Sequence, residues 1–268
     1  MWSYYGSKSK VVDLYPRPKC QKIIEPFAGS ARYSLKWFDR DVLLVDKYPV
    51  IVRLWHFLQK CQPSDIMRLP EPTYKQSVES FDISPDEKLL LGFMVAQGIA
   101  SPQKIVQQFS DIPHEKKRIS ESLFKIKHWK IVLGSYDEIE NQQATWFIDP
   151  PYQIGGEHYR MSNKDLDYSK LASWSQSRLG HVIVCENTKA DWLPFFAMRQ
   201  MTGAYTTTTE AIWSNYPTDF DAQQLSLFAE AQLTLPAPDR GDSPALNRLS
   251  APEAGSGLGN ESNPAPCG

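Results

Sequence analysis

Short apolar runs alternate along the chain with stretches of helical character, and this alternation limits the possible folds most strongly. Residues 22–24 and 41–46 have the β-branched composition of strands, and residues 31–38 between them have helical character. Further strand-like runs occupy residues 129–133, 144–148, 181–185 and 206–214. Strands that alternate with helices usually form a parallel sheet. We therefore expect an α/β fold.

Residues 53–130 differ from the rest, because they carry few strand signals and are mostly helical in pattern. The segment 84–87 (Ser-Pro-Asp-Glu) forms a capping box with proline at the first helical position, which predicts a helix after it. Ser101 and Pro102 are interpreted as the start of another helix. The region is therefore predicted to be a helical insertion.

The charge balance excludes a globally basic nucleic-acid-binding protein, because the 268 residues carry a formal net charge of −2. Any contact with nucleic acid must then come from a local basic patch. No apolar stretch approaches the roughly 18 residues that suggest a membrane span. No two cysteines have the CxxC spacing typical of zinc sites. We expect a cytoplasmic monomer with no metal site and no membrane contact.

The segment Asp149–Tyr152 (Asp-Pro-Pro-Tyr) directly follows the strand-like run 144–148. Strand ends are where ligands bind in α/β sheets. Asp149 offers a carboxylate acceptor, the Pro150 carbonyl is a second acceptor, and Tyr152 offers an aromatic face. Together they suit a planar base with an exocyclic amine. The alternative is an ordinary turn, since Asp and Pro are common turn residues.

A second small-residue turn, Glu25–Ser30, follows the first strand-like run. Glu25 and Phe27 flank this turn, and the small residues Ala28 and Gly29 allow a ligand to approach the backbone. Asp46 ends the next strand about 20 residues on, which is the spacing of a ribose-binding carboxylate. The chain has no GxGxxG sequence, so a nucleoside ligand without pyrophosphate is favoured.

The segment before the first strand, residues 4–10, is basic. It is either a flexible end, as termini commonly are, or a loop that folds over the ligand so that Lys8 reaches a carboxylate.

Five segments in order resemble the Dam-type adenine-specific DNA methyltransferases. They are YYGSKSK (4–10), EPFAGS (25–30), VDKYP (45–49), DPPY (149–152) and EAIWSNY (210–216), so the resemblance spans roughly residues 2–218. It implies a Rossmann-like methyltransferase sheet with helices on both faces and a small helical insertion. The catalytic domain would comprise residues 1–52 and 131–220, and residues 53–130 would recognise the target.

The resemblance also implies S-adenosyl-L-methionine as methyl donor and double-stranded DNA as substrate. Carried over by position, the donor-binding residues are Tyr4, Lys8, Glu25, Phe27, Ala28, Gly29, Asp46, Ser135, Tyr136 and Asp149. The catalytic segment that would hold the target adenine is Asp149, Pro150, Pro151 and Tyr152. The adenine would be flipped out of the duplex to receive the methyl group on its 6-amino nitrogen.

The chain departs from the family pattern at several positions. Ser7 and Ala31 stand where the family has glycine, and Ser135-Tyr136 stands where it usually has Asp-Phe or Asp-Tyr. Either Ser135 or Asp137 could take over that contact with the donor. The insertion lacks the Asn/Gly-rich hairpin of many relatives, so no target sequence can be carried over.

Other functions of the same fold stay open. The chain could methylate the exocyclic amine of cytosine or an adenine in RNA, or it could be an inactive relative that binds DNA or a sliding clamp. A role in restriction-modification, in regulation or in phage self-protection is equally compatible with the sequence.

A basic cluster lies at the end of the insertion and is the predicted contact with DNA phosphates. Its members are Lys116, Lys117, Arg118, Lys125, Lys127 and Lys130. The alternative is a solvated helix face.

Residues 221–232 contain a possible sliding-clamp-binding peptide with Gln224, Leu225, Leu227 and Phe228 as its anchors. The alternative is a short terminal helix with Leu225 and Phe228 on one face. Residues 233–268 are rich in Pro, Ala, Gly and Ser, and their composition predicts a disordered tail.

Overall fold

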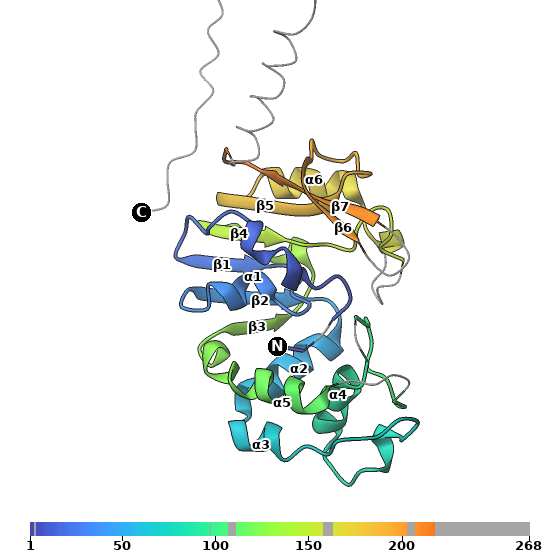
Figure 1. Ribbon diagram of the computed structural model, residues 1–268. Helices are drawn as coiled ribbons and strands as arrows, with labels where there is room; N and C mark the ends of the chain where they lie inside the picture. The colour runs from blue at the N-terminus through green and yellow to red at the C-terminus, as the bar shows by residue number, and fades with distance from the viewer. Residues whose placement is uncertain (3, 97, 107–110, 158–162, 203–206, 218–268) are drawn as a thin grey trace, which may run out of the picture.

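The computed structural model describes residues 1–2, 4–96, 98–106, 111–157, 163–202 and 207–217 (Figure 1). The predicted clamp-binding segment 221–232 and the predicted tail 233–268 lie outside these residues. A seven-stranded sheet forms the centre, in the order β3-β2-β1-β4-β5-β7-β6. Its strands are β1 (Lys22–Glu25), β2 (Asp41–Asp46), β3 (Lys130–Leu133), β4 (Ala144–Ile148), β5 (Gly180–Asn187), β6 (Phe196–Thr202) and β7 (Thr207–Ser214).

The predicted α/β fold is confirmed, with one addition at the sheet edge. Strands β1 to β5 pair in parallel, whereas β7 is antiparallel to both β5 and β6. Strand β6 was not predicted, because its sequence FAMRQMT mixes polar and apolar residues and contains no long apolar run. Such a pattern is typical of an edge strand that faces solvent on one side.

Helices cover both faces of the sheet. Helix α1 (Arg32–Lys36) connects β1 to β2, and α2 (Pro49–Lys60) follows β2 in the connection to β3; these strands lie on one side of β1 in the sheet. Helix α6 (Tyr168–Gln176) connects β4 to β5, which lie on the other side of β1. Right-handed crossovers then place the two groups on opposite faces. The β5 side chains agree, since Ile183 and Cys185 belong to one buried cluster and Val182 and Val184 to the other.

The chain between β2 and β3 forms the helical region that was predicted. It contains α3 (Pro63–Met67), α4 (Pro85–Met94) and α5 (Ile112–Ser120), and these helices gather beyond the β3 edge of the sheet (Figure 1). The predicted capping box starts α4, with Ser84 Oγ accepting from Glu87 N at 3.3 Å and Glu87 Oε2 accepting from Ser84 N at 2.8 Å. Target recognition by this region stays a prediction. The 3-10 helices of the described chain are Lys8–Lys10, Val12–Leu14, Val78–Ser80, Leu123–Ile126, Tyr136–Glu138 and Asn163–Asp165.

The predicted helix at Ser101 is wrong, because residues 101–106 form an irregular segment with bends and a single bridge from Ile105 to Ser77. Their backbone pairs with an earlier segment, through Val78 N to Lys104 O at 2.7 Å and Val106 N to Gln76 O at 3.1 Å. These hydrogen bonds satisfy the peptide groups without a helix.

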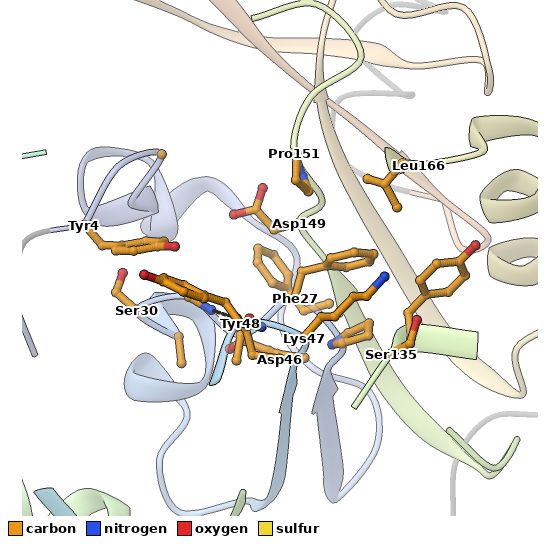
Figure 2. Close-up of a pocket in the computed structure, with 18 of the residues that line it drawn as sticks. Tyr4, Phe27, Ser30, Asp46, Lys47, Tyr48, Ser135, Asp149, Pro151 and Leu166 are labelled. Atoms are coloured by element: carbon orange, nitrogen blue, oxygen red, sulfur yellow. Dashed lines mark hydrogen bonds between the residues drawn. The ribbon is translucent and has the colours of Figure 1, made fainter. Parts of the chain in front are cut away.

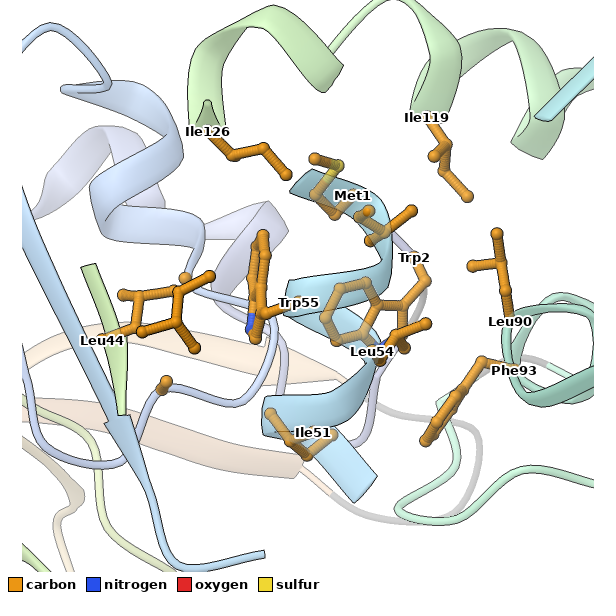
Figure 3. Close-up of a cluster of buried hydrophobic side chains, with 14 of the residues drawn as sticks. Met1, Trp2, Leu44, Ile51, Leu54, Trp55, Leu90, Phe93, Ile119 and Ile126 are labelled. Carbon is orange, nitrogen blue, oxygen red and sulfur yellow. The ribbon is translucent and has the colours of Figure 1, made fainter. Parts of the chain in front are cut away.

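An aromatic core joins the helical region to the sheet. Side chains from the N-terminus, β2, α2, α4 and α5 converge in Figure 3. Trp2 is fully buried, with ring centroids 4.8 Å from Trp55 and 6.1 Å from Phe93. This packing holds the N-terminal segment, and therefore residues 4–8, against the sheet. In the described part of the chain, no helix has the length and apolarity to cross a bilayer.

Candidate functional site

A cavity of about 250 Å³ lies at the carboxyl ends of the parallel strands. It is bounded by the residues that follow β1 (25–32), β2 (46–48), β3 (135–137) and β4 (149 and 151), by the N-terminal residues 4–8, and by Asp165–Asp167 with Lys170. The topology reverses direction between β1 and β4, and such switch points are where open α/β sheets bind ligands. Figure 2 shows Asp149 above and Asp46 below in the cavity, with Tyr4 and Leu166 on opposite sides.

The turn after β1 needs glycine at position 29. Gly29 has φ +44°, and a Cβ there would lie 3.2 Å from Cε1 of Tyr4. Asp46 fixes this turn from the neighbouring strand, because its Oδ2 accepts from Gly29 N at 2.9 Å and its Oδ1 from Tyr48 N at 2.8 Å. Ala31 also has a positive φ, +44°, so it adopts a backbone conformation in which the glycine of the family pattern would be unstrained.

Burial raises the pKa of Asp46 to about 6, although the hydrogen bonds from Gly29 and Tyr48 lower it in part. Both oxygens of Asp46 accept backbone N–H groups, and the residue lines the cavity.

One wall of the cavity is aromatic. The rings of Phe27 and Tyr136 stack with centroids 5.5 Å apart and an interplanar angle of 28°. Ser135 and Asp137 line the same wall. Asp137 accepts from Lys170 Nζ at 2.6 Å, and this bond lowers the pKa of Asp137. Both candidates for the missing acidic contact thus lie at the cavity, and Asp137 already holds a cation.

Lys8 lines the cavity, and the carboxylates that it reaches belong to the protein itself. Its side chain is buried, and its Nζ lies 2.9 Å from Asp149 Oδ1, 3.5 Å from Glu210 Oε1 and 2.5 Å from the Tyr152 hydroxyl. Two carboxylates within the protein therefore already neutralise this ammonium group. Desolvation raises the pKa of Asp149 to about 6, while the charge of Lys8 lowers it.

Glu210 is a site residue to which the sequence assigned no role. Its Oε1 accepts from the hydroxyls of Tyr15 at 2.5 Å and of Tyr152 at 2.7 Å. Strand β7 is antiparallel, so Glu210 pairs with Asn187 at the carboxyl end of β5. The only sequence signal was the quoted segment 210–216.

Of the remaining residues of the predicted catalytic segment, Pro151 lines the cavity and Pro150 and Tyr152 lie next to those that do. The Pro151 carbonyl accepts from the Tyr168 hydroxyl at 2.7 Å. Within the described chain, no group donates a hydrogen bond to the Pro150 carbonyl. Lys8 Nζ stands 4.4 Å from the Tyr152 ring centroid. A base stacked on Tyr152 would therefore use the opposite face of the ring.

Glu25 lies in the cavity wall at the end of β1 and is 2% exposed. Its Oε1 accepts from Ser34 N at 2.7 Å. Burial raises the pKa of Glu25 to about 8, with a smaller contribution in the same direction from Asp149. Glu25 is therefore mostly protonated at neutral pH.

The predicted DNA-binding cluster does not form one basic face. Lys116 is set apart by its burial, because its side chain is 5% exposed and its Nζ donates to Leu69 O at 2.7 Å and Glu71 Oε1 at 2.8 Å. Lys127 donates to two backbone carbonyls, and Arg118 pairs with Glu115. Lys117, Lys125 and Lys130 stay candidates. The predicted clamp anchors Gln224, Leu225, Leu227 and Phe228 lie outside the described residues.

Comparison with known proteins gives weak likenesses only. No known family and no curated protein matches the chain. Among solved structures, the "Putative methyltransferase yhhF from Escherichia coli" has a TM-score of 0.31 and 8% identity, covering 72% of this chain and 76% of that one. A "putative methylase" from Haemophilus influenzae has a TM-score of 0.33 and 10% identity, covering 74% and 81%. Likenesses at this level support no functional conclusion, so the cavity itself must support one.

Proposed function

We propose that this chain transfers a methyl group from S-adenosyl-L-methionine to the 6-amino nitrogen of adenine in DNA. The observation that carries the proposal is Asp149, a carboxylate at the carboxyl end of β4 that faces a cavity at the switch point of the sheet. The proposal agrees with the family resemblance of the five sequence segments.

The residues around the cavity fit the parts of the donor. Gly29 lets a ligand approach the turn after β1, Asp46 offers carboxylate lone pairs to ribose hydroxyls, and the Phe27 and Tyr136 rings offer an apolar wall to an adenine. Glu25 supplies a carboxyl group for a sulfonium centre. When bound, the donor supplies an already activated methyl group, so the protein contributes mainly alignment.

The target amine needs two hydrogen-bond acceptors, because its lone pair is delocalised into the base. Asp149 and the Pro150 carbonyl are adjacent acceptors, and bonds to an ionised acceptor are the stronger kind. Lys8 lies against Oδ1 of Asp149, and this oxygen is shielded from solvent. The Asp149 side chain as a whole is 18% exposed. Oδ2 is therefore the oxygen that would receive the amine. Such bonds strengthen as positive charge develops on the nitrogen.

Lys8 also keeps Asp149 in the form that the reaction requires. Burial alone would favour the protonated carboxyl, which is a poor acceptor. The charge of Lys8 counteracts burial and holds the pKa of Asp149 at about 6, so the group is mostly ionised at neutral pH.

The test is Asp149→Asn, with Asp41→Asn as matched control because Asp41 is an exposed carboxylate at the opposite end of β2. Methyl transfer from a tritiated donor to duplex DNA should fall by about a hundredfold or more in Asp149→Asn and stay unchanged in the control. Donor affinity should change little in both variants. Undiminished transfer by Asp149→Asn would reject the assignment.

Nucleoside analysis of the methylated duplex separates the substrate classes. Cytosine carries the same kind of exocyclic amine, so N4-methylcytosine in the product would replace the adenine proposal by the cytosine alternative. Methylation of RNA in preference to DNA would replace the DNA substrate. Lys117, Lys125 and Lys130 are proposed phosphate contacts, and clamp binding by residues 224–228 stays a proposal.

A further inference from the structure

Three of the carboxyl groups that line the cavity lie at the ends of the adjacent strands β2, β1 and β4, and their hydrogen-bond and ion-pair partners differ. Asp149 has the Lys8 ammonium at 2.9 Å. Asp46 accepts from two backbone N–H groups. Glu25 accepts from a single backbone N–H, that of Ser34. Among the described residues, no cation lies within 4.0 Å of the Glu25 carboxyl.

The other charged groups near the cavity do not compensate Glu25. Arg32 donates to Ser7 Oγ and to the Trp2 carbonyl, and Lys170 is paired with Asp137. Lys47 also lines the cavity, but it forms no ion pair with Glu25. The titratable and charged groups that bear on Glu25 are Asp149 after β4, Tyr33 in α1, Asp46 after β2 and, through Asp149 and Glu210, Lys8. Glu25 is thus a buried carboxyl that lines the cavity and has no cation beside it among the described residues.

A cation in the cavity would change the protonation of Glu25. An opposite charge within about 4–6 Å favours the ionised form of a carboxyl group. The methyl donor carries its positive charge on sulfur, and the product of transfer is a neutral thioether with the same nucleoside and amino-acid parts. Donor and product therefore differ in the property to which Glu25 responds.

We propose that Glu25 distinguishes the donor from its product: the sulfonium binds with release of one proton from the Glu25 carboxyl, and the thioether binds while Glu25 keeps its proton. This inference rests on the proposed function. Protons balance over one turnover. Methyl transfer converts the sulfonium to a thioether and frees one proton from the amine, and Glu25 takes up one proton to replace the one it released when the donor bound. The donor is then held more tightly than the product, which favours product release.

The experiment is calorimetric titration of the wild-type chain with S-adenosylmethionine and with S-adenosylhomocysteine at pH 7. Buffers of different ionisation enthalpy give the number of protons exchanged on binding. We expect nearly one proton released with the donor and almost none with the product. Raising the pH to 9 should abolish the release, since Glu25 is then ionised before the ligand binds.

The variant Glu25→Gln tests whether the released proton comes from Glu25. The matched control is Glu121→Gln, because Glu121 is an exposed carboxylate. Glu25→Gln should release no proton with the donor and should reduce the preference for donor over product by about fivefold or more, whereas the control keeps both. Equal proton release with both ligands, or release that persists in Glu25→Gln, would overturn the inference and leave the proposed function standing. Binding of neither ligand would overturn both.

Discussion

Replacing Glu25 by glutamine should change how the stability of the fold depends on pH. The pKa of the buried carboxyl is about 8 in the folded chain, against an ordinary value of 4.5. A carboxyl whose folded pKa is raised stabilises the fold fully below its unfolded pKa, and this stabilisation disappears as the pH rises through the folded pKa. Each pH unit in this window corresponds to about 1.36 kcal/mol.

The free energy of unfolding of the wild type should therefore fall by roughly 3 kcal/mol between pH 4.5 and pH 7 through this group alone, and by roughly 5 kcal/mol up to pH 9. Glutamine keeps a carbonyl oxygen for Ser34 N but does not titrate. Glu25→Gln should be close to the wild type near pH 5 and exceed it progressively as the pH rises from there.

Urea unfolding followed by far-ultraviolet circular dichroism at pH 5, 6, 7, 8 and 9 measures this difference. Asp46 and Asp149, with pKa values of about 6, titrate in both proteins and so largely cancel. Glu121→Gln should follow the wild type at every pH. Parallel curves for the wild type and Glu25→Gln from pH 5 to pH 9 would refute the reasoning that burial keeps Glu25 protonated.

Two further substitutions test particular contacts. Lys116→Met should lower the free energy of unfolding by about 1–3 kcal/mol because a buried carbonyl loses its donor, whereas Lys117→Met should not; equal urea midpoints would contradict the buried role of Lys116. Gly29→Ala and Gly98→Ala both place a side chain at positive φ, at a cost of about 1–2 kcal/mol, but only at position 29 does the new Cβ meet Tyr4, at 3.2 Å. Calorimetry should therefore show weaker donor binding in Gly29→Ala alone; equal donor affinity in both variants would show that Tyr4 yields freely.

The central strands could be predicted because each is buried on both faces. Strand β4 is buried at all five positions and β5 at all eight, so both appear in the sequence as continuous apolar runs. Strand β6 lies at the sheet edge and lacks such a run, which is why it was missed. The irregular segment at 101–106 was assigned wrongly, because its conformation depends on backbone pairing with residues 76–78 and on no local signal.

The residues of the candidate site also differ in how far the sequence could predict them. Asp46 ends β2, Asp149 directly follows β4, and Gly29 lies in the turn after β1, so local sequence locates all three beside the cavity. The bond from Tyr15 to Glu210 joins residues that are 195 positions apart, and only the antiparallel turn of β7 brings them together. The burial of Lys116 could not be predicted, because a run of basic residues in sequence does not reveal which side chain the fold buries.

The position of Lys8 explains how two buried carboxyls at neighbouring strand ends come to differ. Asp149 and Glu25 both lose hydration at the cavity, and desolvation raises both pKa values. Lys8 lies against Asp149, so Asp149 stays mostly ionised at neutral pH, while Glu25 lacks such a partner and stays mostly protonated. Carboxyls whose pKa values are separated by their surroundings commonly have separate roles in catalysis. Here the ionised one suits the acceptance of an amine, and the protonated one can respond to a positive charge that the reaction removes.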